Sequence, residues 1–230
     1  MVARKINIAL DGYSACGKST LAQALAKTLH YDYVDSGAMY RAMTLYALRN
    51  NFNEQNLHLL KSQLAHIKIE CEYSEHGNIT LLNDENVTDL IRTPAIQNLV
   101  SQVSTIPEVR RFLVLQQQSM ALNGGVVMDG RDIGSKVLPK AELKIFMTAD
   151  IEVRVERRLK ELVDKGIIID REEIKQNLSF RDHIDSTRED SPLLQTADAK
   201  VLDNSTMTPE AQLKVVLNWV NEVLNQSNRS

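Results

Sequence analysis

Four residues near the N-terminus have the types and the spacing of a phosphate-binding loop. Gly12 and Gly17 are separated by four residues, and Lys18 and Ser19 follow directly. In the pattern G-x-x-x-x-G-K-[ST], the glycines let backbone N–H groups turn inward, the lysine contacts the β- and γ-phosphates, and the hydroxyl ligates Mg²⁺. We therefore expect a nucleoside triphosphate at these residues: Gly12, Tyr13, Ser14, Ala15, Cys16, Gly17, Lys18, Ser19 and Thr20. The loop does not indicate what the phosphate is used for.

Arginine is the second residue type whose placement fits phosphate chemistry. Phosphoryl transfer depends on positioning and on electrostatic stabilisation of the transferring group, and a guanidinium binds phosphate through two parallel hydrogen bonds. Surface arginines are common, so the interpretation is strongest for Arg131, which lies beside Asp129 and Asp132 after an apolar run. The arginines near expected strand ends or on charged expected helices are Arg41, Arg92, Arg110, Arg131, Arg154, Arg157, Arg158, Arg181 and Arg188.

One arginine group has the spacing of a single helix face. Arg181, Asp185 and Arg188 are spaced i, i+4, i+7, so a helix would place them on the same side. They fit a salt-bridge ladder on the surface, and they fit equally a clamp for an anionic substrate that carries hydroxyl groups. The spacing alone does not choose between these two interpretations.

A second arginine group lies in a charged segment, 150–165, that we expect to be helical. Arg154, Arg157 and Arg158 fit a mobile lid that brings arginine over the phosphates and excludes water. They also fit a solvated charged face, which would be preferred without the phosphate loop.

Carboxylates at the ends of expected strands suit magnesium, which prefers oxygen ligands and keeps several waters. Asp35 and Asp129, together with Ser19, are the candidate ligands, directly or through water. For Asp35 a turn or capping role fits equally well. The histidines have no ligand spacing, so we assign no transition metal.

These side chains need a scaffold, and apolar runs alternating with helical periodicity provide one. Strands alternating with helices predict a parallel sheet covered on both faces, with ligands beyond the carboxyl ends of the strands. A segment at about 66–90 alternates and contains turn residues, which predicts a small inserted antiparallel sheet. The expected core strands are Ile6–Leu10, Tyr31–Gly37, Gly125–Asp129, Leu143–Met147 and Ala199–Asp203.

The whole chain has the composition of one ordinary globular domain. It has 230 residues, 43% of them hydrophobic and 25% charged, with a net charge of −3. The weak negative charge disfavours a nucleic-acid carrier, and no apolar run has the length of a membrane span. The N-terminus enters the first strand within a few residues, which leaves no room for a signal peptide. Only Cys16 and Cys71 occur, so we expect no structural disulfide and a cytoplasmic protein that binds neither nucleic acid nor membranes.

Four motifs together resemble the bacterial cytidylate kinases, over essentially the whole chain. They are Asp11-Gly12 with Gly17-Lys18-Ser19-Thr20, the run Asp35-Ser36-Gly37-Ala38-Met39-Tyr40-Arg41, the run Asp129-Gly130-Arg131-Asp132-Ile133-Gly134, and Arg181-Asp182 with Asp185 and Arg188.

The resemblance implies the fold of the P-loop nucleoside monophosphate kinases, an α/β fold. Its five-stranded parallel sheet has the order 2-3-1-4-5 with helices on both faces, a small antiparallel insertion that binds the nucleoside monophosphate, and a helical lid. One domain, 1–230, would then comprise a core at about 1–60, 98–150 and 191–230, an insertion at about 61–97 and a lid at about 151–190.

The resemblance also implies an ATP-dependent phosphotransferase of pyrimidine nucleotide metabolism. It would transfer the γ-phosphoryl group of ATP to CMP or dCMP with Mg²⁺, and we expect a monomer. Lys18, Arg131 and Arg157 or Arg158 would act on the transferring group. Asp132 would accept from the amino group that distinguishes cytosine from uracil. The implied acceptor-binding residues are Ser36, Arg41, Ser101, Arg110, Arg131, Asp132, Arg181, Asp185 and Arg188.

Two residues depart from the family pattern in the phosphate loop. Tyr13 stands where proline is usual, and Cys16 lies in an interior where glycine or alanine is usual. Cys16 is either a tolerated small side chain or a thiol whose oxidation blocks ATP binding, because helix N-termini favour thiolates. The alternative functions are a kinase of another nucleoside monophosphate or of a small hydroxylated acid, a GTPase, and a nucleic-acid-binding module. The chain has no N-K-x-D guanine motif.

Overall fold

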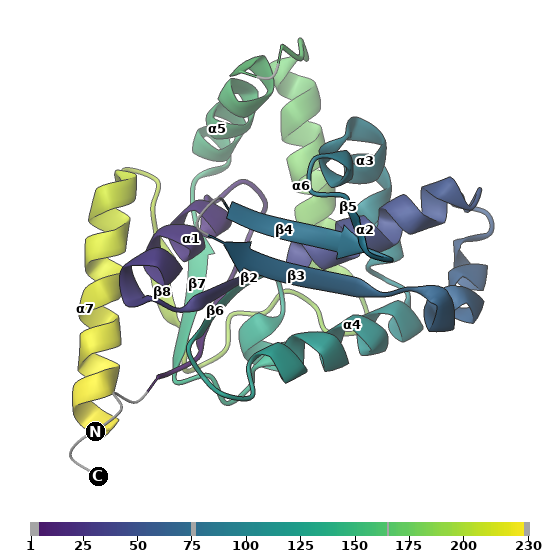
Figure 1. Cartoon of the computed structure of the whole chain (residues 1–230). Coiled ribbons are helices and arrows are strands. Elements are labelled where there is room, and N and C mark those ends of the chain that lie inside the picture. Colours follow the sequence, from purple (N-terminus) through teal and green to yellow (C-terminus); the bar gives the residue numbers. More distant parts are fainter. Residues whose placement is uncertain (1–4, 75–76, 165, 228–230) are drawn as a thin grey trace.

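A five-stranded parallel sheet forms the centre of the fold in the computed structural model, which describes residues 5–74, 77–164 and 166–227. The strand order is β2-β6-β1-β7-β8 (Figure 1), which confirms the predicted order of the five core strands. The strands are β1 (Ile8–Gly12), β2 (Asp32–Asp35), β6 (Val126–Asp129), β7 (Leu143–Thr148) and β8 (Lys200–Asp203).

Helices cover both faces of this sheet. Helices α1 (Lys18–Leu29) and α7 (Pro209–Ser227) pack on one face, where Leu25 and Val216 are fully buried. The other face is covered by α4 (Pro107–Met120) and a single π turn, η3 (Ile133–Val137). Every residue of β1 is buried, as expected for a central parallel strand with both faces covered.

The segment between β2 and α4 builds a separate layer beside the sheet. It contains α2 (Ser36–Arg49), the 3₁₀ segments η1 (Leu57–His66) and η2 (Leu90–Arg92), and α3 (Pro94–Val103). The predicted antiparallel sheet is confirmed as β3 (Ile69–Ser74), β4 (Gly77–Leu82) and β5 (Glu85–Asn86). Pro94 and Pro107 each open a helix, where their missing N–H has no cost.

Helices α5 (Ile151–Asp164) and α6 (Arg171–Thr187) stand beside one another above the sheet (Figure 1). They share a small apolar cluster that contains Val155, Leu162, Ile174 and Leu178. This pair occupies most of the predicted lid, 151–190, and its role as a lid stays a prediction. Residue 165 and the two ends of the predicted domain, 1–4 and 228–230, lie outside the described residues. No described helix has the length and apolar character that a membrane crossing requires.

Strand register brings the predicted site residues to one edge of the sheet. Asp129 at the end of β6 pairs with Leu10 of β1 and with Asp35 of β2. Strand β2 ends at Asp35, within the polar turn predicted at the end of Tyr31–Gly37, because Asp35 caps α2 by accepting from the N–H of Ala38 at 2.8 Å. The carboxylates therefore meet beside the start of the phosphate loop.

Candidate active site

A single cavity of about 500 Å³ collects most of the predicted residues. Its wall combines the phosphate loop, the start of α2, the end of β6, and side chains from α3, α4, α5 and α6. Gly12, Tyr13, Ser14 and Arg157 stand outside this wall. The predicted residues that line it are Ala15, Cys16, Gly17, Lys18, Ser19, Thr20, Asp35, Ser36, Arg41, Ser101, Arg110, Asp129, Arg131, Asp132, Arg158, Arg181, Asp185 and Arg188.

The phosphate loop holds its lysine by backbone carbonyl groups. Lys18 Nζ donates to the carbonyl oxygens of Gly12, at 2.9 Å, and Tyr13, at 2.7 Å. Burial, together with the charge of Arg131, lowers the pKa of Lys18 to about 8. Gly17 has φ 87°, a left-handed conformation that glycine adopts without steric cost. The loop therefore presents a buried ammonium group beside the N-terminus of α1, which suits an anionic ligand.

The carboxylate of Asp129 fits a magnesium site that also uses ligand phosphates. It accepts from Ser19 Oγ at 3.0 Å and from the Tyr33 hydroxyl at 2.6 Å. Burial and the neighbouring Asp35 raise its pKa to about 6, so a cation here would be favourable. No cluster of three or more His, Cys, Asp or Glu suited to a metal occurs among the described residues. One carboxylate and one hydroxyl match Mg²⁺, which binds few protein ligands when phosphates and water supply the rest.

Asp35 is committed to other partners. One of its oxygens caps α2, and the other pairs with Arg41 at 2.7 Å. Its predicted role toward magnesium is therefore best served through water. Ser36 lies next to it and donates its hydroxyl to the backbone carbonyl of Asp129 at 2.6 Å, which ties α2 to the end of β6.

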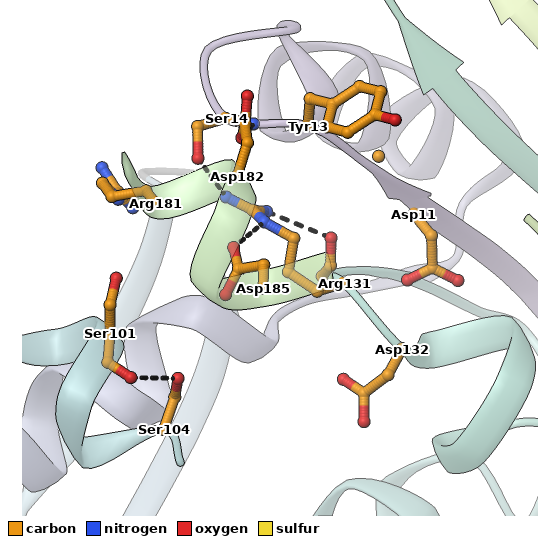
Figure 2. Close-up of polar contacts among 12 residues, drawn as sticks. Asp11, Tyr13, Ser14, Ser101, Ser104, Arg131, Asp132, Arg181, Asp182 and Asp185 are labelled. Carbon is orange, nitrogen blue, oxygen red and sulfur yellow. Dashed lines mark hydrogen bonds and ion pairs between the residues drawn. The ribbon is translucent and has the colours of Figure 1, made fainter. Parts of the chain in front are cut away.

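An arginine–aspartate ion pair is buried in the part of the cavity formed by α4 and the end of β6. Arg110 and Asp132 form an ion pair with only 2% and 6% of their side chains exposed. Arg110 also donates to the carbonyl oxygen of Ser104 at 3.1 Å, and the Ser104 hydroxyl donates to the carbonyl oxygen of Ser101 (Figure 2). The other carboxylate oxygen of Asp132 is not used by Arg110 and lies 3.6 Å from Arg188 Nη2. A rigid carboxylate of this kind can read a hydrogen-bond donor on a ligand.

Asp185 of α6 pairs with one arginine from a distant part of the chain and with one beside its own helix. Arg131 Nε donates to it at 2.8 Å, and Arg188, the C-cap residue of α6, lies 3.4 Å away. Figure 2 shows Arg131 between Asp185 and Ser14. This arrangement decides the spacing question for 181–188, because the three residues line the cavity and do not form a ladder on the surface.

Arg181 has weaker partners than Arg41, Arg110, Arg131 and Arg188. Among the described residues, no carboxylate lies within ion-pair distance of it, and its Nη1 donates to Gln97 Oε1 at 3.4 Å. Its Nε is buried without a hydrogen-bond partner. Burial and the charge of Arg131 lower its pKa to about 10. A ligand group that accepts hydrogen bonds would therefore be favoured beside Arg181.

The three arginines of α5 differ in their surroundings. Arg158 lines the cavity and pairs with Glu161. Arg157 donates to the side chain and backbone oxygens of Asn204, at 2.9 and 2.8 Å, in the turn after β8. Arg154 is buried and contacts the phosphate loop. Arg158 is therefore the one of these three that lines the cavity, and its role toward the ATP phosphates stays a prediction.

The two unusual loop residues have structural explanations. Arg154 lies over the Tyr13 ring at 5.3 Å, and Phe146 contacts the same ring edge-on, so Tyr13 is a packing platform. Cys16 is fully buried in the cluster under α1. This burial favours the interpretation of Cys16 as a tolerated small side chain, and the hypothesis that its oxidation blocks ATP binding stays a prediction.

Several contact residues escaped prediction from the sequence. Tyr33 and Gln97 contact Asp129 and Arg181 through one side-chain atom, from 96 and 84 positions away. Ser104 contacts Arg110 through its backbone carbonyl oxygen, which its residue type does not reveal. Asp182, by contrast, lies inside a motif that the sequence analysis named, but its contact with the phosphate loop is seen only in the structure.

Comparisons with known proteins show the family of this chain. The cytidylate kinase family model matches residues 8–222. The cytidylate kinase of Flavobacterium psychrophilum is 48% identical over 96% of this chain and 100% of its own length. That of Parabacteroides distasonis is 50% identical over 91% and 93%. A solved structure of a putative kinase from Chloroflexus aurantiacus has a TM-score of 0.52 and 14% identity over 98% and 99% of the two chains, which supports the fold alone. The chain belongs to the cytidylate kinase family.

Proposed function

We propose that this enzyme transfers the γ-phosphoryl group of ATP to CMP or dCMP, giving ADP and CDP or dCDP. Membership of the cytidylate kinase family supports this activity. The observation that carries the choice of acceptor is the buried Arg110–Asp132 pair, which stands in the same cavity as the phosphate loop. A fixed carboxylate oxygen matches the amino group of cytosine and mismatches the carbonyl of uracil.

The side chains around the cavity divide the work of an in-line transfer. Lys18 would hold the β- and γ-phosphates, and Arg131 and Arg158 would neutralise charge on the transferring group. A phosphate oxygen of the acceptor attacks the γ-phosphorus, and the bond from that phosphorus to the β–γ bridging oxygen breaks. Because a phosphate oxygen is already ionised, no side chain is needed as a general base.

The remaining side chains would position the acceptor. Arg41 and Arg131, with Ser36, face its phosphate. Arg181 and Asp185 suit the sugar hydroxyl groups, and Ser101 and Arg188 suit the base side of the cavity. Ser19 and Asp129 would hold Mg²⁺, which when bound neutralises charge on the ATP phosphates. We infer that the enzyme works as a monomer in the cytoplasm.

A coupled assay of ADP release tests the proposal directly. CMP, dCMP, UMP, AMP and GMP are offered as acceptors at equal concentration with ATP and Mg²⁺, and a thermal-shift screen adds small hydroxylated acids. We expect turnover with CMP and dCMP well above that with UMP and the purine nucleotides. Preferred turnover of a purine nucleotide, or stabilisation by a small acid alone, would overturn the choice of acceptor.

A further inference from the structure

Ser14 of the phosphate loop is held through all three of its polar groups by residues outside the loop. Its N–H donates to Asp182 Oδ1 at 2.9 Å, and its hydroxyl accepts from Arg131 Nη2 at 3.0 Å. Its carbonyl oxygen accepts from Arg154 Nη1 at 3.2 Å. The position of Ser14 therefore depends on the positions of these three partner side chains.

Two of these partners connect Ser14 to helix α6. Asp182 belongs to α6, and Arg131 is bound to Asp185 one turn further along the same helix. Figure 2 shows Ser14 and Asp182 next to one another above the Arg131–Asp185 pair. Helix α6 also carries Arg181. The helix that faces the acceptor is therefore linked to the loop that faces the donor.

Arg154 makes the Asp182 contact rigid. Its guanidinium pairs with the second oxygen of Asp182 and lies over the Tyr13 ring. The side chains of Arg154 and Asp182 are only 9% and 12% exposed. A carboxylate that is nearly buried between an amide and a guanidinium is fixed in direction, because both of its oxygens are used.

The loop needs such support at the next residue. Ala15 has φ 58°, a left-handed conformation that costs an L-residue with a side chain roughly 1–2 kcal/mol. Backbone outliers of this kind persist when neighbouring contacts determine them. Holding Ser14 therefore also fixes the direction in which the following loop amides point.

We propose that Asp182 is a positioning residue that couples occupancy of the acceptor site to the shape of the donor loop. The inference rests on the proposed function, because it takes α6 as the helix that binds the acceptor. When CMP fixes α6 through Arg181 and Asp185, Asp182 and Arg131 hold Ser14, and the loop is ordered for ATP. Coupling is reciprocal, so bound ATP favours CMP by the same factor.

Calorimetric titration measures this factor as the ratio of Kd values for a non-hydrolysable ATP analogue without and with saturating CMP. For the wild-type protein we expect CMP to tighten analogue binding by at least about fivefold, the lower end for coupled sites. Asp182→Asn leaves one acceptor oxygen for two donors, and Asp182→Ala leaves none. In both variants the ratio should fall to near one, while Kd for CMP alone stays within about twofold of wild type.

Two further variants separate coupling from a structural effect. Ser14→Ala cuts only the link to Arg131 and should lower the ratio partly, and the Asp182→Asn/Ser14→Ala double variant reports whether the two links act together. His183→Ala, an exposed residue on the same helix, is the matched control and should keep the wild-type ratio. Thermal unfolding confirms that each variant is folded.

The outcomes separate this inference from the proposed function. An unchanged ratio in folded Asp182→Asn would overturn the role of Asp182 while leaving the kinase activity in place. Weaker CMP binding by Asp182→Asn with an unchanged ratio at saturating CMP would also overturn it, since Asp182 would then act on the acceptor alone. A wild-type protein that binds no CMP would overturn both.

Discussion

Asp132→Asn changes the hydrogen-bonding character of the acceptor cavity and keeps its shape. Asp132 uses one oxygen for Arg110, and the other lies 3.6 Å from Arg188. We expect this second oxygen to accept from the exocyclic amino group of cytosine. Asparagine has one acceptor oxygen and one NH₂ group. Its NH₂ group must therefore face either Arg110 or the cytosine amino group, and both of these are hydrogen-bond donors that need an acceptor.

The size of the effect follows from the loss of one hydrogen bond to a charged group. Such a bond contributes about 1.5–3 kcal/mol, which corresponds to a loss of about 10–150-fold in kcat/KM for CMP. UMP presents a carbonyl at that position and can accept from the new NH₂ group, so its kcat/KM should fall much less. The CMP-to-UMP ratio should therefore drop by at least about tenfold.

Stability must be measured alongside, because Arg110 is buried and keeps only Ser104 as a full partner. We expect Asp132→Asn to lower the free energy of unfolding by about 1–3 kcal/mol, with a folded protein at the assay temperature. Asp84→Asn is the matched control: Asp84 is 79% exposed and pairs with Lys68 in a turn of the small sheet. Equal losses with CMP and UMP in folded Asp132→Asn would refute the assignment of base reading to Asp132.

Four other predictions concern the donor loop. Because the pKa of Lys18 is lowered to about 8, the group loses its charge as pH rises through that value, and KM for ATP should rise above pH 8; a flat KM to pH 9.5 contradicts this. Lys18→Ala should lower kcat by at least about a hundredfold with unchanged circular dichroism. Gly12→Ala would place a Cβ 2.0 Å from the Met147 carbonyl oxygen at φ +145°, so urea unfolding should show a loss of at least about 1–3 kcal/mol. In a Cys71→Ser background, Cys16 should react with a thiol reagent only after unfolding, and rapid reaction of the native protein would argue against its burial.

Local patterns were sufficient for the scaffold and the donor loop. The phosphate loop is one continuous segment, so its spacing, its strand and its helix could all be predicted from neighbouring residues. The order of the core strands came from resemblance and was confirmed. The end of β2 at Asp35 was also predicted, because polar turn residues follow the apolar run there, and Asp35 is the N-cap of α2.

The spacing of residues in the sequence did not predict which side chains pair with one another. The ladder interpretation of 181–188 assumed that Asp185 pairs within its own helix, and one such contact exists, at 3.4 Å to Arg188. Its shorter contact comes from Arg131, 54 residues away. The Ser14–Asp182 contact joins residues 168 positions apart. Helical periodicity predicts which residues share a face, and it does not predict which part of the chain that face meets.

The distribution of charge explains how several arginines can line one cavity when no ligand is bound. Arg41, Arg110 and Arg131 each have a carboxylate partner in the cavity wall, so these arginines are held in place and their charges are partly compensated. Arg181 has no such partner among the described residues, and burial lowers its pKa to about 10. A ligand group that accepts hydrogen bonds, such as a sugar hydroxyl, can therefore bind beside Arg181, on the same helix as Asp182. Arg181, which we expect to bind the acceptor, is thus next to Asp182, which contacts the donor loop. The coupling that we propose between the two substrates therefore passes through α6.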